Sequence, residues 1–244
     1  KNSLIEYCNI AHPDRQFIFV EPKNWADSNV GPGESALACK SYLQRPFYIQ
    51  TGDTIIDVSL PYLDGNWLGM APTCLPEKYS TIKVDEHLNV IDFVNKCSNG
   101  YDNAFMGIAG IRDYNVFWSE LEQATDSELV SAWFKPNVWP NLKAKELPWF
   151  DTGNLDDIQK TKEHFGDSPL SLYKNIDDTT YLVGQRFMKF SSNKDINENR
   201  YRRGIILDSL VPKNLGKSDN FIYYDWEPGK TLYEYDSLQK YQWF

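Results

Sequence analysis

The first fifty residues alternate between helical and strand-like patterns, and this alternation constrains the fold more than any other feature. Residues 4–8 have helical periodicity, and residues 16–20 form a short apolar run that Pro22 stops. After a polar loop, a second helix is expected over 34–43 and a second strand over 46–50. The short apolar runs are typical of buried parallel strands. Helix–strand alternation therefore indicates an α/β sheet with crossover helices.

The middle of the chain departs from this alternation, because several short strand-like runs follow one another. They predict an inserted antiparallel portion, followed by a glycine-rich strand and two further helices. The expected elements are strands over 67–70, 81–84, 90–93 and 105–111 and helices over 116–121 and 155–165. We therefore expect a first domain, residues 1–165, with a mixed, mainly parallel sheet.

The pattern changes again after residue 166. The expected elements there are a hairpin over 180–184 and 186–190, a polar helix over 196–210 and a strand over 221–226. These elements are enough for a small α+β domain, which we place at residues 166–244.

Charge and cysteine use exclude two classes of site. The formal net charge is −9 and the pI is 4.9, whereas a nucleic-acid groove needs a basic face. The basic run Arg200, Arg202 and Arg203 lies close to acidic residues, so we interpret it as a salt-bridged helix face. The four cysteines are scattered without a C-x-x-C pair. We therefore expect reduced thiols and no zinc site.

The sequence shows no signal-peptide pattern and no apolar run long enough to cross a bilayer. With reduced thiols, this predicts a cytoplasmic protein without a membrane or nucleic-acid partner, and a homo-oligomer stays open. Aromatic residues make up 15% of the chain. This share suits carbohydrate-binding surfaces, but hydrophobic cores account for it more simply. A start at Lys1 rather than Met suggests an upstream part.

Two acidic positions are placed to hold a cation at the mouth of the predicted sheet. Gly52 and Asp53 follow a predicted strand, and ligands of open α/β sheets bind outside the carboxyl ends of strands. Asp151 lies in a loop that precedes a helix. Mg²⁺ is usually held by one or two carboxylates together with substrate phosphates. Each position taken alone is also typical of a turn or a helix start.

Taken in order, four segments resemble the sugar-phosphate nucleotidyltransferases. They are residues 31–38, 48–53, 105–111 and 149–153. The resemblance implies a Rossmann-like core that joins a nucleoside triphosphate to a sugar phosphate or a phosphocholine-like alcohol phosphate and releases pyrophosphate. It also implies Mg²⁺ as cofactor and a role in capsule or surface-polysaccharide synthesis.

The resemblance assigns roles to individual positions. Asp53 and Asp151 take the places of the two Mg²⁺ ligands and are expected to be catalytic. The nucleotide is expected at Gly31, Gly33, Glu34, Ser35 and Gly52. The sugar phosphate or similar ester is expected at Lys96 and Gly107, with Asn95 in place of the family's usual Glu.

The second predicted domain resembles the small lobe of choline-kinase or aminoglycoside-phosphotransferase-like domains. The matching segments are 186–190, 198–203, 210–212 and 224–232. Capsule-type proteins fuse such a domain behind a nucleotidyltransferase. The resemblance implies that Lys189 grips ATP phosphates, that Glu198 pairs with Lys189, and that Trp226 begins the adenine hinge.

Two parts of these families have no counterpart in the sequence. No glycine-rich phosphate loop with a basic residue precedes the first motif, and the kinase-like part ends at Phe244, before any catalytic-loop Asp. Either the chain is a segment of a longer Mg²⁺-dependent enzyme, or it is a catalytically dead scaffold that binds glycans or proteins. Because Asp53, Lys96, Asp151 and Lys189 are all present, we favour the segment.

Overall fold

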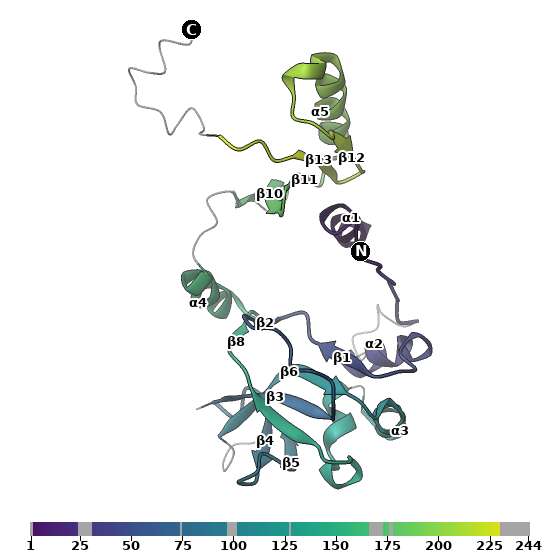
Figure 1. Cartoon of the computed structure of the whole chain (residues 1–244), viewed down its shortest axis with the longest axis vertical. Coiled ribbons are helices and arrows are strands. Elements are labelled where there is room, and N and C mark those ends of the chain that lie inside the picture. The colour runs from purple at the N-terminus through teal and green to yellow at the C-terminus, as the bar shows by residue number, and fades with distance from the viewer. Residues whose placement is uncertain are drawn as a thin grey trace. The chain divides into compact units, whose positions relative to one another are not determined.

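The chain folds into two compact units (Figure 1). The structure is a computed structural model that describes residues 2–23, 31–73, 75–96, 102–126, 128–165, 173–175 and 178–229. The larger unit is Val20–Gly166, and the smaller unit combines Lys1–Phe19 with Asp167–Phe244. The sequence placed residues 1–19 in the first domain, whereas in the structure they group with the second half of the chain.

A six-stranded sheet forms the centre of the larger unit. Its strands are β1 (Phe47–Gln50), β3 (Trp67–Pro72), β4 (Ser80–Val84), β5 (Val90–Asn95), β6 (Asn103–Ile111) and β7 (Lys143–Glu146). The order is β5-β4-β6-β3-β7, and β1 also pairs with β6. The expectation of a mixed sheet is confirmed, but a mainly parallel one is wrong. Among the described strands only β3 and β7 pair in parallel, because β6 runs against β1, β3 and β4.

The helices of the larger unit form close to their predicted positions. Two further strands pair only with each other and form a separate two-stranded ribbon. The helices are α2 (Pro32–Ala38), α3 (Tyr114–Gln123) and α4 (Leu155–Phe165), with 3-10 turns η1 (Lys40–Tyr42), η2 (Leu129–Trp133) and η3 (Pro136–Val138). The ribbon consists of β2 (Thr54–Ile56) and β8 (Trp149–Asp151).

The strand predicted over residues 16–20 is wrong. This segment has no sheet partner among the described residues, and the division between the two units falls at Phe19. Ile18 and Phe19 are 57% and 40% exposed. An apolar run becomes a buried strand only where neighbouring strands pair with it and other elements cover its faces, and no described strand pairs with this one.

Aromatic side chains fill the core of the larger unit. Phe117 and Trp133 are fully buried, and their ring centroids lie 5.6 Å apart. α3 contributes Phe117, Trp118 and Leu121 to the same cluster, which lies against the sheet. Truncating such side chains to Ala typically costs about 3–5 kcal/mol. The interpretation of the aromatic residues as core is confirmed for these positions.

Asn66, just before β3, is a buried polar clamp. Its Oδ1 accepts hydrogen bonds from Arg112 N at 3.0 Å and Asp113 N at 2.9 Å. Its Nδ2 donates to Pro140 O at 3.1 Å and to the Asp113 carboxylate. The side chain therefore joins the ends of β3 and β6 to the segment before β7.

Asn66→Ala is expected to lower the free energy of unfolding by about 1–3 kcal/mol, because it leaves two backbone N–H groups without their acceptor. Urea denaturation measures the change. Asn89→Ala is the control, because that amide bonds to Asp85 within a single turn. A difference below about 0.5 kcal/mol between the two variants would contradict the role assigned to Asn66.

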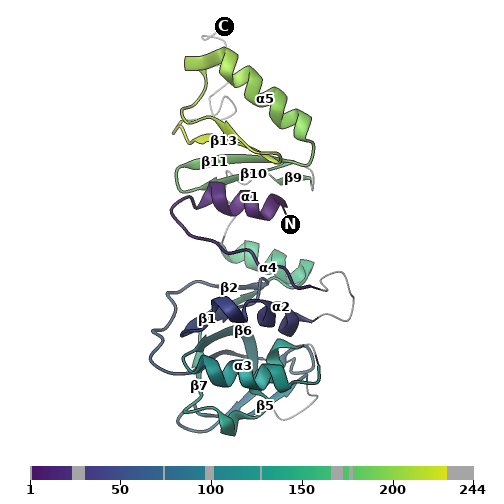
Figure 2. The same ribbon diagram turned by 90° about the vertical axis from the view of Figure 1, so that its right-hand side faces the viewer.

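The smaller unit is a five-stranded antiparallel sheet with one helix on each face (Figure 2). Its elements are α1 (Asn2–Ala11), β9 (Tyr173–Asn175), β10 (Asp178–Val183), β11 (Arg186–Ser191), α5 (Lys194–Leu207), η4 (Asp208–Leu210), β12 (Gly216–Lys217) and β13 (Phe221–Asp225). The order is β12-β13-β11-β10-β9. α1 packs against Met188 and Phe221, and α5 faces Lys189 and Ile222. The predicted hairpin forms as β10 and β11.

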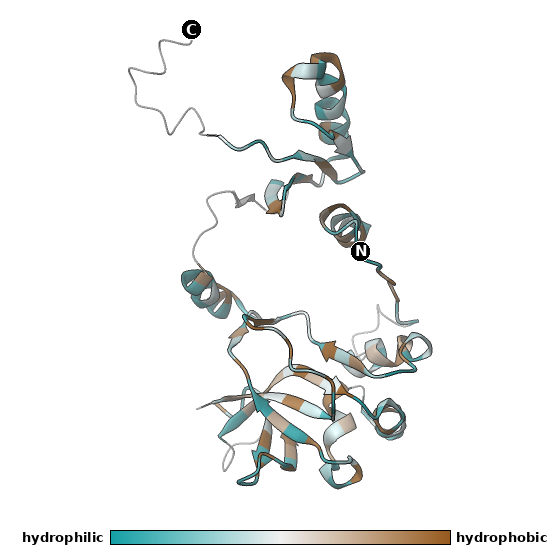
Figure 3. Cartoon of the chain, in the orientation of Figure 1, coloured by the Kyte–Doolittle hydropathy of each residue, from teal (hydrophilic) through white to brown (hydrophobic). Residues whose placement is uncertain are grey.

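α5 approaches the sheet through small and polar residues rather than through an apolar stripe. Its buried residues are Asn197 and Gly204, and a Cβ atom at Gly204 would lie 2.2 Å from Leu215 Cδ2. Hydrophobic side chains remain exposed at its C-terminal end (Figure 3), where Ile206 is 81% exposed. Within the residues that the structure describes, no helix has the length and apolar character needed to cross a membrane.

Candidate active site

The two acidic positions singled out in the sequence meet in the β2–β8 ribbon. Thr54 lies opposite Asp151 in this antiparallel pair. One step further, the backbone N and Oγ1 of Thr152 both donate to Asp53 O at 2.9 Å. Asp53 and Asp151, which are far apart in the sequence, therefore occupy neighbouring positions.

The carboxylates of Asp53 and Asp151 converge on Gly153. A Cβ atom placed at Gly153 would lie 3.1 Å from Asp151 Oδ1 and 3.5 Å from Asp53 Oδ2. The backbone N of Gly153 donates to Asp151 Oδ1 at 2.8 Å. Glycine keeps the space beside both carboxylates open, which explains on steric grounds why the last residue of the segment 149–153 is glycine.

An irregularity in β6 fixes the turn that carries Asp53. Gly107 has φ of +75°, a conformation that favours glycine, and the β3–β6 register shifts beside it. Gly107 O accepts a hydrogen bond from Thr51 N at 2.8 Å, and Met106 O accepts one from Thr54 Oγ1. Both ends of the turn are therefore held against the sheet.

Sequence reasoning missed three residues around Asp151. Lys78 Nζ donates to Asp151 Oδ2 at 3.0 Å and to Asp157 Oδ2 at 2.5 Å, and the Tyr79 hydroxyl donates to Asp151 Oδ2 at 2.8 Å. Burial opposes the charge on Lys78, but hydrogen bonds with Asp157, Tyr79 and Asp151 raise its pKa above the usual value. The hydrogen bond from Lys78 lowers the pKa of Asp157.

No local pattern marks these three residues. Lys78 and Tyr79 look like ordinary residues of a turn before a strand, and Asp157 looks like an acid in the first turn of a helix. The signal that could have found them is spatial, because Lys78 and Tyr79 reach Asp151 only if β4 begins next to the β2–β8 ribbon.

Residues of α2, the Asp53 turn, β6, η2 and the β2–β8 ribbon line a cavity of about 160 Å³. Its polar lining is Thr51, Asp53, Thr54 and Asp151, and its other lining residues are Pro32, Tyr79, Phe105, Met106, Gly107, Leu129, Val130 and Trp149. Ligand pockets usually measure about 300–1,000 Å³, so the cavity fits part of a nucleotide-sized ligand. Asp53 and its turn are exposed, so a larger ligand can extend outward.

The structure brings several of the predicted binding residues to this cavity. Asp53, Asp151 and Gly107 line it, and Gly31 caps α2 next to the lining residue Pro32. Gly52 precedes Asp53 in the same turn, with open space around its Cα.

Other predicted binding residues lie apart from the lining. Gly33 is buried within α2, and Glu34 and Ser35 are exposed on that helix. Lys96 follows Asn95, which pairs with Ser80. The register therefore places exposed Lys96 at the same end of the sheet as Tyr79.

The donor set fits a hard divalent cation. Two carboxylates with exposed space beside them are what Mg²⁺ needs when substrate phosphates and water complete its coordination. Across the described ranges, no group of three or more His, Cys, Asp or Glu side chains is arranged to hold a metal by itself. Cys8 and Cys39 are free thiols, and Cys74 and Cys97 lie outside the described residues.

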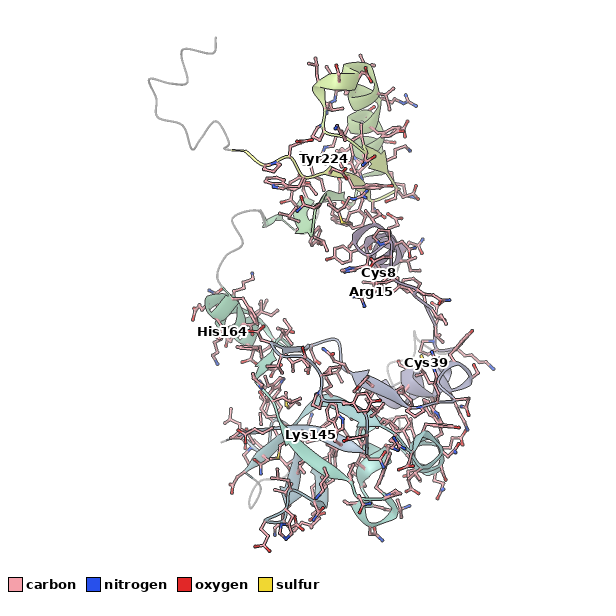
Figure 4. The ribbon with its side chains drawn as sticks, viewed as in Figure 1. Cys8, Arg15, Cys39, Lys145, His164 and Tyr224 are labelled. Atoms are coloured by element: carbon pink, nitrogen blue, oxygen red, sulfur yellow. The ribbon has the colours of Figure 1, made fainter. Side chains whose placement is uncertain are left out.

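The smaller unit places Lys189 on the α5 face of its sheet, in a cavity of about 350 Å³ that Arg200 and Arg203 also line. Tyr224 of β13, labelled in Figure 4, lines the same cavity. The pairing of Glu198 with Lys189 stays a prediction, and Glu198 has two other partners. Its ion pairs are with Arg202, one helical turn away at 2.7 Å, and with Lys217 of β12 at 2.6 Å.

The ion pair between Arg202 and Glu198 confirms the salt-bridged helix face that the sequence predicted for this basic run. Trp226 follows β13, donates its backbone N–H to Gln185 O at 2.7 Å, and packs on Phe187.

Comparison with solved structures identifies the fold. One similar structure, assigned as a glucose-1-phosphate thymidylyltransferase from Bacillus anthracis in complex with sucrose, is 15% identical with a TM-score of 0.57, and the match covers 67% of this chain and 71% of that one. The inositol-1-phosphate CTP transferase from T. maritima is 19% identical with a TM-score of 0.53, over 66% and 70% of the two chains.

At these identities the likeness shows the fold alone. The Rossmann-like nucleotidyltransferase fold expected from the sequence is confirmed. No protein-family model matches the chain, and no curated protein matches it. The kinase-like character of the smaller unit stays a prediction.

Proposed function

We propose that the larger unit is the core of an Mg²⁺-dependent nucleotidyltransferase. The enzyme would join a nucleoside triphosphate to a sugar phosphate or a phosphocholine-like alcohol phosphate and release pyrophosphate, for capsule or surface-polysaccharide synthesis. The convergence of Asp53 and Asp151 on Gly153, beside a cavity, carries the proposal. The nucleotidyltransferase-like fold supports it. Nucleoside triphosphate substrates favour the cytoplasm as the setting.

In this proposal, residues of the protein bind Mg²⁺ and the second phosphate substrate and fix the orientation of the Asp151 carboxylate. Asp53 and Asp151 hold Mg²⁺, which when bound neutralises charge on the triphosphate. Tyr79 and the backbone of Gly153 fix the orientation of the Asp151 carboxylate. Exposed Lys96 supplies positive charge for the second phosphate substrate at the same end of the sheet.

The smaller unit is proposed to be kinase-like. Its hairpin β10–β11, helix α5 and strand β13 follow one another in the order that the resemblance implies. Lys189 lies on the strand before the helix and faces it. This arrangement supports a phosphate-binding role for Lys189.

A thermal-shift scan tests the proposed function. CTP, UTP, GTP and dTTP are each added with Mg²⁺, and one of them is expected to raise the melting temperature, because a ligand at 100 times its Kd adds about 2.7 kcal/mol. Asp53→Asn is expected to remove the shift. No shift with any nucleotide, together with stabilisation by an oligosaccharide or a partner protein, would instead favour a non-catalytic binding module.

A further inference from the structure

The Lys78 ammonium group forms an ion pair with Asp151, one of the two candidate metal ligands. Lys78 Nζ bridges Asp151 Oδ2 and Asp157 Oδ2 at 3.0 and 2.5 Å. The side chains of Asp151 and Asp157 are only 17% and 15% exposed, and that of Lys78 is 35% exposed. This ion-pair group is partly shielded from water, so its charges interact more strongly than those of an exposed pair.

The two oxygens of Asp151 have different surroundings. Oδ2 accepts from Lys78 and from the Tyr79 hydroxyl. Oδ1 accepts from Gly153 N and lies on the side of Asp53 Oδ2. Each carboxylate oxygen offers two lone pairs, so one on Oδ1 remains for an ion shared with Asp53. A divalent cation and the Lys78 ammonium can therefore occupy the same carboxylate.

We propose that Lys78 is a positioning residue that sets the divalent-cation affinity of the Asp53–Asp151 pair, by placing a competing positive charge on Asp151. This inference rests on the proposed function, in which the pair holds Mg²⁺. The Lys78 ammonium group and a divalent cation bound to Asp151 repel each other, so the Asp53–Asp151 pair binds a divalent cation weakly when no nucleotide is present. A triphosphate brings negative charge that offsets the repulsion. The ion is therefore expected to bind together with the nucleotide.

A purely structural role for Lys78 predicts the opposite result. If Lys78 served only to hold Asp151 in place, its removal would loosen the carboxylate and weaken cation binding. However, Tyr79 and the Gly153 backbone N–H still hold Asp151 after Lys78 is removed. Loss of the competing charge therefore dominates, and the sign of the change distinguishes the two roles.

Titration of the full chain with Mn²⁺ alone, with free Mn²⁺ followed by electron paramagnetic resonance, measures the affinity directly. Lys78→Met is expected to bind Mn²⁺ about tenfold more tightly than the unaltered chain, and Lys78→Arg, which keeps the charge, is expected to remain within about twofold of it. Unchanged or weaker binding by Lys78→Met would overturn the proposal. Circular dichroism and melting temperature show that each variant is folded.

Two further variants separate this inference from the proposed function. Lys83→Met removes the same charge from an exposed position on β4, and its Mn²⁺ affinity is expected to stay within about twofold of the unaltered chain. Asp53→Asn added to Lys78→Met is expected to abolish the tight binding. If Mn²⁺ binding is insensitive to Asp53→Asn in both backgrounds, the proposed function fails as well. If it depends on Asp53 but Lys78→Met does not tighten it, only the role of Lys78 fails.

Discussion

Asp53→Asn and Asp151→Asn are each expected to slow Mg²⁺-dependent pyrophosphate release by about a hundredfold to a thousandfold in the full-length protein, the loss typical of removing one preorganised electrostatic group. An amide keeps the size of the carboxylate but loses the negative charge that a hard cation requires. A coupled assay of pyrophosphate formation with the nucleotide found by the thermal scan measures the effect.

Asp156→Asn is the matched control for both variants. Asp156 is exposed in the first turn of α4, next to the residue that pairs with Lys78, and its replacement is expected to leave turnover within about twofold, as for most surface changes. Because Asp151→Asn also weakens the contact with Lys78, its melting temperature has to be compared with that of the unaltered protein. Turnover close to normal in either Asp53→Asn or Asp151→Asn would end the assignment.

Gly107→Ala is expected to lower the free energy of unfolding of the larger unit by about 2–4 kcal/mol. A Cβ atom there would lie 2.2 Å from Thr51 Oγ1 and 3.1 Å from Thr54 Oγ1, and Ala is unfavourable at φ of +75°. The turn that carries Asp53 would have to move, so the nucleotide-dependent thermal shift should be lost too. Urea denaturation and the thermal scan give the two readouts.

Gly65→Ala controls for the loss of a glycine as such. A Cβ atom at Gly65 would have no neighbour within 4 Å among the described residues, so the change is expected to stay within about 0.5 kcal/mol. If Gly107→Ala unfolds at the same urea concentration as Gly65→Ala, β6 does not hold the turn in the way described.

The position of most elements was predictable because local periodicity depends on which side chains are buried. The runs over 67–70, 81–84 and 90–93 became β3, β4 and β5, and the pattern over 155–165 became α4. The direction of the pairings was not predictable, because a short apolar run looks the same in parallel and antiparallel sheets. For the same reason the run over 16–20 resembled a strand, although it pairs with no strand in the part of the chain that the structure describes.

The residues of the candidate site also fall into those that the sequence predicted and those that it did not. Asp53, Gly107 and Asp151 were found because they belong to motifs with a fixed local sequence, and all three line one cavity. Lys78 and Asp157 carry no such local signature, and Lys78 joins Asp151 to Asp157 only because β4 begins beside the β2–β8 ribbon. The ion pair of Glu198 with Lys217 was not predictable either, since Lys217 comes from a strand that the sequence did not predict.

The sequence by itself determined the α/β character, the aromatic core and the two aspartates of the candidate site, because burial patterns and short motifs are properties of neighbouring residues. Only the tertiary structure decided the sheet directions, the grouping of α1 with the smaller unit and the pairing of Lys78 with Asp151. These depend on contacts between distant segments, and the free energy of such contacts is set by which surfaces meet in the folded chain.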